Sequence, residues 1–253
     1  MVHFVGAGSG AADLITVRGA RLLSEADVII YAGSLVNPEL LQGAKPGCAI
    51  FDSAKMTLEQ VLETIRDAEE AGKTTVRLHT GDSSIFGAVR EQFDALDRLG
   101  IAYDVCPGVS AFCGAAAALR AEYTLPEVSQ TVILTRMAGR TPVPERERIR
   151  DLAAHGATMV LYLSTGLSAE LQAELLAGGY PAETCAAVVY KATWPEERCY
   201  RCTVGTLHET VTKNGLRKTA LIVVGDCLGS EYARSKLYDP AFTTEFRTSA
   251  QPE

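Results

Sequence analysis

The stretch Val2-His3-Phe4-Val5-Gly6-Ala7-Gly8-Ser9-Gly10 decides the fold class, because a short apolar run ends in a glycine-rich loop. An amphipathic segment follows over residues 13–26, and a run of buried-strand composition comes after it over residues 27–31. A strand, a glycine loop, a helix and a second strand in this order predict a βαβ unit, which requires a parallel sheet. The sequence therefore predicts an α/β protein.

The same alternation continues along the chain and predicts two α/β domains. A helix is expected over residues 57–71, with Thr57 and Gln60 as a capping box and Gly72 at its end. A helix is also expected over residues 145–154. Strands are expected at residues 75–78, 103–106, 131–135, 158–163, 185–190, 200–204 and 219–224. We expect an N-terminal domain of residues 1–120 with a parallel sheet, a C-terminal domain of residues 121–238 with a mixed sheet, and a tail of residues 239–253.

Composition disfavours several classes of protein. A net charge of −7 over 253 residues argues against a nucleic-acid-binding protein, which normally has a basic domain. Neither an apolar run of ~18 residues nor a basic segment ahead of an apolar one occurs, so we expect no membrane span and no secretion signal. The seven cysteines are odd in number and scattered, which predicts reduced thiols and a cytoplasmic protein.

Cys199 and Cys202 have the C-x-x-C spacing of redox and zinc motifs. No second cysteine or histidine pair stands at metal-ligand spacing, so we expect no bound metal. Both residues fall in an expected strand, where side chains three positions apart point to opposite faces. We therefore expect ordinary buried thiols at both positions.

Gly6, Gly8 and Gly10 invite comparison with the dinucleotide-binding fingerprint G-x-G-x-x-G. Position 11 is alanine, and the second strand ends in Tyr31-Ala32-Gly33, without an acidic residue for a ribose. Both departures disfavour NAD, and the missing acid also disfavours the common Rossmann-like methyltransferases. Two interpretations of the loop stay open: a ligand-binding loop, or a turn that packs helix on sheet.

Two later loops follow strands, where ligands bind in open α/β sheets. They read Gly81-Asp82-Ser83-Ser84-Ile85-Phe86-Gly87 and Pro107-Gly108-Val109-Ser110-Ala111. Asp82 is suited either to a cationic ligand or to an Asx-turn, and Ser110 either to a ligand or to a helix N-cap. His79, beside the first of these loops, is the one histidine worth testing as a base.

Five arginines lie between Arg136 and Arg150. Interleaved acidic residues predict a solvated, salt-bridged helix face for Arg148 and Arg150. Arg136 and Arg140 precede that helix, in a loop at the carboxyl end of an expected strand. There their guanidinium groups are suited to bidentate contact with ligand carboxylates.

The three loops, in this order, resemble those of the tetrapyrrole methylases, the S-adenosylmethionine (SAM)-dependent enzymes of sirohaem and cobalamin synthesis. The resemblance extends from Val2 to about Asp226. Within the family, residues 31–36 and 136–145 look like the methyltransferases that act at C11 of precorrin-4. The resemblance implies two α/β domains with SAM in the cleft between them, a homodimer, and methylation of C11 of precorrin-4 to give precorrin-5.

The resemblance also implies which residues bind the two ligands. Contacts to SAM are expected from Ser9, Thr80, Gly81, Asp82, Ile85, Ser110, Ala111, Leu163, Ala192, Thr219 and Ala220. A substrate with several carboxylates needs cationic anchors, expected at Arg136 and Arg140 with Arg146 behind them. Many relatives have proline at Ser9 and Ser83 and methionine at Leu163, and the last exchange keeps an apolar contact. We predict no catalytic residue, because methyl transfer mainly needs alignment of the reacting atoms.

Other functions remain open at this point. One is the cobalt-precorrin-4 enzyme of the anaerobic route. Another is a methylase of the same fold that acts at a different ring position, or on diphthine or ribosomal RNA, although the modest basicity argues against RNA. The third, of another class, is a non-catalytic tetrapyrrole-binding protein with a decayed SAM site. The intact loops at Gly81-Asp82 and at residues 107–110 argue against decay.

Overall fold

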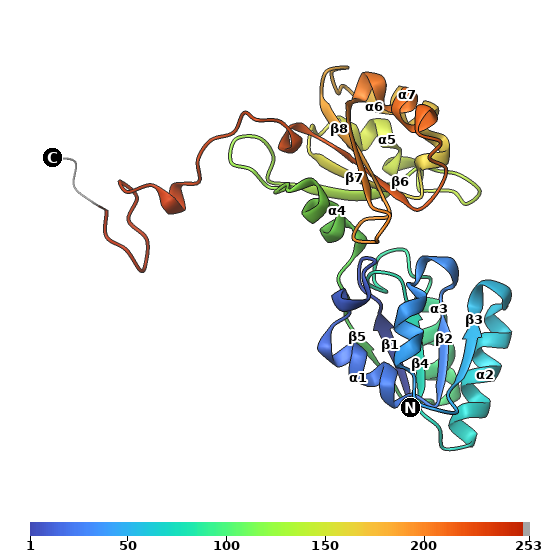
Figure 1. Cartoon of the computed structure of the whole chain (residues 1–253). Coiled ribbons are helices and arrows are strands. Elements are labelled where there is room, and N and C mark those ends of the chain that lie inside the picture. Colours follow the sequence, from blue (N-terminus) through green and yellow to red (C-terminus); the bar gives the residue numbers. More distant parts are fainter. Residues whose placement is uncertain (250–253) are drawn as a thin grey trace. The chain divides into compact units, whose positions relative to one another are not determined.

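The computed structural model describes residues 1–249, which form two compact α/β units. The first unit consists of Met1–Ala115 and Lys191–Glu197, and the second begins at Ala116, runs to Tyr190 and resumes at Arg198. The segment Lys191–Glu197 lies inside the predicted C-terminal domain, so its place in the first unit differs from that expectation. Of the predicted tail, residues 250–253 lie outside the described residues. Each unit is described separately below (Figure 1).

The first unit contains a five-stranded sheet in the order β3-β2-β4-β1-β5, and every pairing in it is parallel. The strands are β1 (Val2–Gly6), β2 (Val28–Tyr31), β3 (Ala49–Asp52), β4 (Thr75–His79) and β5 (Tyr103–Cys106). Gly6 pairs with His79, and Val5 pairs with Cys106. Because the strands are parallel, the loops that follow β1, β4 and β5 all leave the same edge of the sheet.

Helices cover both faces of this sheet. They are α1 (Val17–Glu25), α2 (Leu58–Glu70) and α3 (Arg90–Leu99), while α4 (Ala111–Leu119) follows β5 and has residues in both units. Leu23 of α1 packs with Ile29 on one face, and the opposite face packs on α2 and α3. The capping box predicted at Thr57 is confirmed. The helix expected from residue 13 begins only at Val17, where the side chain of Thr16 accepts a hydrogen bond from the Gly19 N–H.

The second unit contains a mixed sheet in the order β6-β7-β10-β8-β9. The strands are β6 (Val132–Arg136), β7 (Thr158–Tyr162), β8 (Cys185–Tyr190), β9 (Arg198–Thr203) and β10 (Ala220–Val224). Only β6 and β7 pair in parallel; the other neighbours in this sheet are antiparallel. The mixed sheet predicted for this part of the chain is therefore confirmed.

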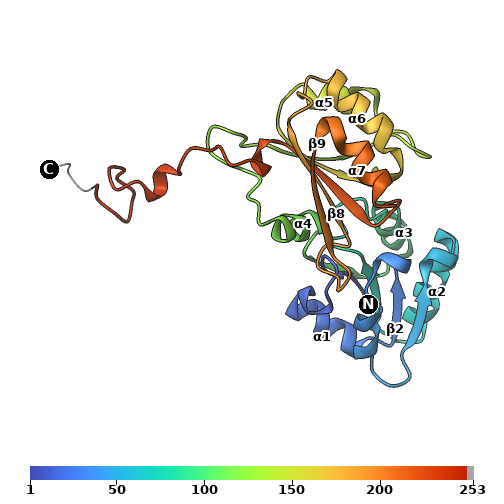
Figure 2. The same ribbon diagram turned by 45° about the horizontal axis from the view of Figure 1, so that its top comes forward.

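Three helices gather on one side of this second sheet, as Figure 2 shows. They are α5 (Ile149–Ala153), α6 (Ser168–Ala177) and α7 (Leu207–Lys213). Leu171, Leu175 and Leu207 are fully buried against Met159 and Leu161 of the sheet. The prediction of a single helix over residues 145–154 is wrong, because a 3₁₀ turn at Glu145–Glu147 precedes a short α5. Within residues 1–249, no helix is both long and apolar enough to cross a membrane.

Candidate functional site

Three loops meet at the carboxyl edge of the first sheet. The N–H of Ala7, just after β1, donates to the carbonyl of His79 at the end of β4, with an N···O distance of 2.7 Å. Gly8 and Gly81 then exchange two backbone hydrogen bonds of 3.3 and 3.0 Å. The loop after β1 is thus paired with the loop after β4, beyond the ends of the strands themselves.

Two glycines let these loops touch through their main chains. A Cβ atom on Gly108 would lie 2.2 Å from the carbonyl oxygen of Gly81, and one on Gly6 would lie 2.6 Å from the Cα of Gly108. No side chain fits at such distances, because the atoms that it would meet belong to backbone. Gly6 and Gly108 therefore serve the packing of one loop on another, which sequence reasoning missed.

The carboxylate of Asp82 joins two of the loops. Its Oδ2 accepts a hydrogen bond of 2.7 Å from the N–H of Gly108, and its Oδ1 accepts one of 2.9 Å from the N–H of Ser84. Burial disfavours the charged form of this carboxyl, but the hydrogen bonds from Ser84 and Gly108 outweigh burial and lower its pKa. Asp82 therefore makes the predicted Asx-turn and stays ionised at neutral pH. Its contact with a cationic ligand stays a prediction.

Two buried polar atoms beside this loop lack a protein partner. Within residues 1–249, these are the side-chain atoms Thr80 Oγ1 and His79 Nε2. Burial, and then the charge of Arg77, lower the pKa of His79 to about 3, so its ring is neutral. The ring stacks on Phe4 at a centroid distance of 6.1 Å. Because His79 belongs to the core, we assign it no proton transfer; the hydroxyl of Thr80 is an available ligand group.

The loop after β5 leads directly into α4. Ser110 is buried, and its carbonyl accepts a hydrogen bond of 3.0 Å from the N–H of Cys113 in the first turn of that helix. Gly81 has φ of +62°, and a Cβ atom on it would lie 3.3 Å from the nitrogen of Ala111. Ile85 follows in the same loop as Asp82, to whose carbonyl its N–H donates. The structure thus brings together the site residues predicted at positions 80–85 and 110–111.

The segment Lys191–Glu197 lies against the first glycine loop. The hydroxyl of Thr193 accepts a hydrogen bond of 3.0 Å from the N–H of Ala11 and lies 3.3 Å from the hydroxyl of Ser9. A Cβ atom on Gly10 would lie 2.3 Å from Cδ1 of Trp194. The segment also carries Ala192, which is buried. Sequence reasoning missed Thr193 and Trp194, because a contact across more than 180 residues leaves no local signal.

The second unit gathers the remaining predicted SAM residues at one edge of its sheet. Leu163 follows the last residue of β7, and Thr219 precedes the first residue of β10, which is the antiparallel neighbour of β7. The hydroxyl of Thr165 donates to the carbonyl of Ala220 across 3.2 Å and so joins the two strand ends. Arg136 pairs in register with Tyr162, which places the end of β6 at the same edge.

Leu163 and Thr219 both have left-handed backbone conformations. Their φ angles are +53° and +60°, and neither residue is glycine. Such a conformation costs on the order of 1–3 kcal/mol per residue and concentrates at functional sites. Leu163 is also 67% exposed, which is unusual for a large apolar side chain that adjoins a buried strand. These features support the prediction that both positions contact a ligand.

The arginines between residues 136 and 150 differ in their partners: one binds its own loop, two are exposed, and two form salt bridges. Arg136 donates to the carbonyls of its own loop, at Met137, Thr141 and Pro142, with distances of 3.1, 3.2 and 2.7 Å. These bonds give Arg136 a role in shaping its loop, and its contact with substrate carboxylates stays a prediction. Arg140 is exposed, and Arg146 is exposed beside Glu147 at 4.0 Å.

The salt-bridged helix face predicted for Arg148 and Arg150 is confirmed. Arg148 pairs with Asp151 at 2.9 Å, and Arg150 pairs with Glu174. A second device in this region escaped sequence reasoning. The buried hydroxyl of Ser164 donates to the carbonyl of Tyr162 at 2.7 Å and accepts from the N–H of Met137 at 2.8 Å. Ser164 thus ties the arginine loop to the end of β7.

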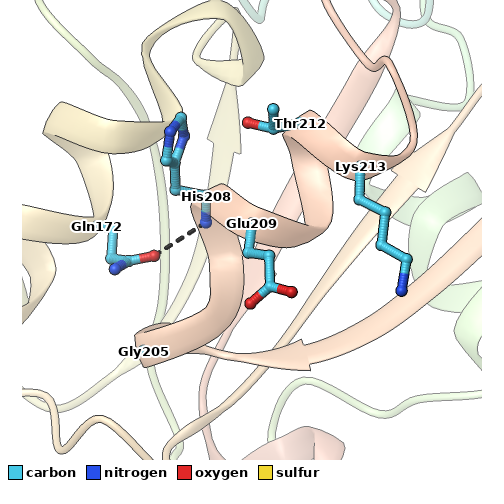
Figure 3. A pocket seen from close by; sticks show the side chains of 6 residues that line it. All are labelled: Gln172, Gly205, His208, Glu209, Thr212 and Lys213. Carbon is cyan, nitrogen blue, oxygen red and sulfur yellow. Dashed lines mark hydrogen bonds between the residues drawn. The ribbon is translucent and has the colours of Figure 1, made fainter.

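A surface pocket of about 580 Å³ lies apart from these strand ends, over α6 and α7 (Figure 3). Within it, the N–H of His208 donates to the side-chain oxygen of Gln172 at 2.9 Å. Glu209 and Lys213 bring opposite charges to the same wall, and none of the predicted site residues is among those lining it. We therefore place the candidate site at the strand ends.

Cys199 and Cys202 both lie on β9, as predicted. Cys199 is exposed, so the expectation of a buried thiol is wrong for that position, while Cys202 is partly buried. Cys202 packs against the core cluster of the second unit, and Cys199, three positions away on the strand, lies on the opposite face. All seven cysteines lie within the described residues, and none of them forms a disulfide there.

Known proteins share this sequence and fold over most of the chain. The model of the tetrapyrrole (corrin/porphyrin) methylases matches residues 1–208. A cobalt-precorrin-4 C(11)-methyltransferase of Methanocaldococcus jannaschii is 51% identical over 98% of this chain and 96% of its own. The chain belongs to the tetrapyrrole methylase family. A precorrin-4 C(11)-methyltransferase of Mycobacterium tuberculosis is 46% identical to this tetrapyrrole methylase, over 95% of this chain and 96% of its own.

Solved structures agree with this assignment to the tetrapyrrole methylases. The X-ray structure of a cobalt precorrin-4 methyltransferase matches with a TM-score of 0.89 and 45% identity, over 90% of this chain and 96% of that one. A uroporphyrin-III C-methyltransferase from Thermus thermophilus, complexed with S-adenosylhomocysteine (SAH), matches with a TM-score of 0.73 and 26% identity, over 90% and 93%. The predicted family and α/β fold class are confirmed.

Proposed function

We propose that this tetrapyrrole methylase transfers a methyl group from SAM to C11 of precorrin-4 and forms precorrin-5. The observation that carries the proposal is the junction of three loops at the carboxyl edge of the first sheet. Gly8 pairs there with Gly81, and Asp82 bonds to Gly108. Near full-length identity to C11-methyltransferases supports the ring position.

The groups at this edge fit SAM. The Thr80 hydroxyl is buried and has no partner among residues 1–249, so it is available to a ligand. Asp82 is ionised and suits a cationic cofactor, and the close main chains at Gly81 and Ala111 leave backbone groups near the ligand. SAM supplies a methyl group that its sulfonium makes electrophilic. We assign its contacts to Ser9, Thr80, Gly81, Asp82, Ile85, Ser110, Ala111, Leu163, Ala192, Thr219 and Ala220.

The substrate anchors belong to the loop that follows β6. A ring with several carboxylates is held by guanidinium groups that are exposed and available, which favours Arg140 and Arg146. Arg136 holds the carbonyls of Met137, Thr141 and Pro142 and so keeps Arg140 in place. The substrate site therefore contains two charged anchors and one arginine that shapes the loop.

Catalysis in this proposal is mainly a matter of alignment. The protein holds the ring carbon and the methyl donor in line and excludes water, and such proximity is worth up to roughly 7–11 kcal/mol of a barrier. Leu163 offers an exposed apolar surface on a rigid turn, which suits it to shield the transferred methyl group. No general base is assigned.

The test uses the full chain, precorrin-4 and SAM labelled with ¹³C in its methyl group. We expect one equivalent of label at C11, located by NMR of the product. Label at another ring carbon would overturn the ring position and leave a different methylase of this family. Calorimetry with SAH tests the class of protein: absence of binding would overturn the enzyme and favour a tetrapyrrole-binding protein.

A second candidate substrate is cobalt-precorrin-4. It is favoured by the 51% identity to a relative named for that substrate and by the TM-score of 0.89 to a structure of such an enzyme. Parallel reactions with the metal-free and the cobalt-containing ring, at equal SAM, separate the two. The preferred substrate is the one with the higher kcat/KM.

We also infer a homodimer, because the family resemblance implies one, and a cytoplasmic protein, because seven cysteines without a disulfide among the described residues fit a reducing compartment. Light scattering of the purified chain tests the first inference, with twice the 27.0 kDa chain mass as the expected result. A monomer at micromolar concentration would overturn it. Fractionation of cells that express the untagged chain tests the second.

A further inference from the structure

The segment Lys191–Glu197 joins β8 to β9, yet it packs with the first unit, on the loop that follows β1. Its third residue, Thr193, has φ of +67°. A β-branched residue is an outlier in that region, where glycine or asparagine is the ordinary choice. Backbone strain of this kind is held by the surrounding contacts and concentrates at functional sites.

The hydroxyl of Thr193 has two partners in the glycine loop. It accepts from the N–H of Ala11 at 3.0 Å, and it shares a hydrogen bond of 3.3 Å with the hydroxyl of Ser9. Ser9 is 6% exposed, so the side chain next to Thr193 has little access to water. One hydroxyl thus sets both the orientation of Ser9 and the course of the chain at Ala11.

Thr193 is itself held in place. Its own N–H donates to the carboxylate of Glu197 at 2.6 Å, which closes the segment into a compact turn. The chain's single tryptophan, Trp194, follows it, and its ring lies where a Cβ atom of Gly10 would be. The amide of Asn37 holds the same loop from another element, by donating to the carbonyl of Gly10 at 3.0 Å.

We propose that Thr193 is a positioning residue for the SAM site, acting through Ser9 and Ala11, and that Trp194 reports the state of this loop by its fluorescence. The proposal rests on the proposed function, because it assumes that the loop at Ser9 binds SAM. It adds a residue that does not itself touch the cofactor. It also predicts that removal of the Thr193 hydroxyl weakens SAM binding and leaves tetrapyrrole binding unchanged.

The experiment compares four full-length proteins by SAH titration, using calorimetry and Trp194 emission. Thr193→Val keeps the shape and removes the hydroxyl, and Thr193→Ser keeps the hydroxyl. Thr64→Val is the matched control, because it removes a hydroxyl that donates to a carbonyl at 2.9 Å on the exposed face of α2. We expect Thr193→Val to raise the Kd for SAH about fivefold, the value of one hydrogen bond, with the other variants within about twofold of wild type.

Further measurements separate positioning from mere support of the fold. At saturating SAM, Thr193→Val should leave the KM for the tetrapyrrole within about twofold of wild type. SAH should change Trp194 emission in wild type and change it less in Thr193→Val. If Thr193→Val does not fold, Thr193→Ala against Thr193→Ser repeats the test, since these two variants differ only in the hydroxyl.

Each outcome decides the proposal. Equal SAH affinity in wild type and Thr193→Val would overturn it and leave the proposed function intact. A lower melting temperature with unchanged Kd would also overturn it, because the residue would then serve only the fold. A wild-type protein that does not bind SAH would overturn the proposed function and, with it, this inference.

Discussion

The carboxylate of Asp82 accepts a hydrogen bond of 2.7 Å from the backbone N–H of Gly108, and it thereby joins two loops whose bonded residues lie 26 positions apart in the chain. The same carboxylate accepts from the N–H of Ser84. A charged acceptor makes stronger hydrogen bonds than a neutral one. The relationship makes Asp82 an organiser of the SAM site as well as a candidate contact to the cofactor.

Substitution of Asp82 by Asn tests this double role. The side chain of Asn has one oxygen and one NH2 group, so its NH2 would face the N–H of either Gly108 or Ser84, a donor against a donor. The junction of the loops should therefore loosen. We expect the Kd for SAH to rise about tenfold or more and the free energy of unfolding to fall by on the order of 1 kcal/mol, since solvent partly screens the site. Calorimetry and urea unfolding measure the two. Asp94→Asn, in an exposed pair with Arg90, is the control and should change neither.

The buried ring of His79 predicts a dependence of stability on pH. Its pKa is about 3 in the folded protein against 6.5 unperturbed, so the unfolded chain takes up a proton that the folded one does not. The contribution of His79 to the free energy of unfolding is fully present above pH 6.5, and it is lost progressively as the pH falls toward 3. Between pH 6.5 and 5 the loss is at most about 2 kcal/mol.

Urea unfolding at these two pH values, in wild type and in His79→Gln, measures that loss. The variant should be less stable overall but should lose less stability on acidification than wild type. Identical losses in the two proteins would show that other groups carry the pH dependence.

The contact between loop backbones predicts a sharp contrast between two glycines. Gly108→Ala would place a Cβ atom 2.2 Å from the carbonyl oxygen of Gly81, whereas Gly43→Ala meets nothing within 4 Å. We expect Gly108→Ala to lower stability by roughly 1–3 kcal/mol or more and to weaken SAH binding. Gly43→Ala should behave as wild type in thermal melting and in calorimetry. A Gly108→Ala protein with normal SAH binding would contradict the assigned loop junction.

The arginine loop predicts two different phenotypes. Arg140→Gln should raise the KM for the tetrapyrrole about tenfold, the value of one charge-assisted hydrogen bond, with an unchanged Kd for SAH and an unchanged melting temperature. Arg136→Gln should lower the melting temperature as well, because it removes hydrogen bonds to three carbonyls of its loop. Steady-state kinetics and thermal melting measure both. Equal effects of Arg140→Gln on KM and on SAH binding would contradict its assignment to the substrate.

Much of the first sheet was predictable from local pattern. The run at residues 2–10 and the capping box at Thr57 are short-range signals, and the structure has the strand and the helix that they predict. β3 was missed because it is an edge strand of four residues, two of them exposed, and so shows no buried run. α7 was also missed. It has only seven residues, and Leu207 and Val211 are its only buried positions.

The candidate site divides in the same way. The loops at Gly81 and Ser110 were recognisable from the sequence, because each follows a strand and parallel strands end at one edge of a sheet. The roles of Arg136 and Arg140 were only partly recognisable from the sequence, because an arginine that binds a ligand and one that binds its own loop look alike there. For Arg136 the structure adds three carbonyl partners in its own loop, which no local pattern shows.

The sequence by itself determined the alternation of strands and helices, the family, and the order of the ligand loops, since these depend on neighbouring residues. Only the tertiary structure decided that Gly6 and Gly108 exist for contact between loops, that Asp82 binds Gly108, and that Thr193 holds Ser9. The physical reason is that such contacts join residues that are distant in the chain. Their geometry arises only once the sheet has brought the loops to one edge.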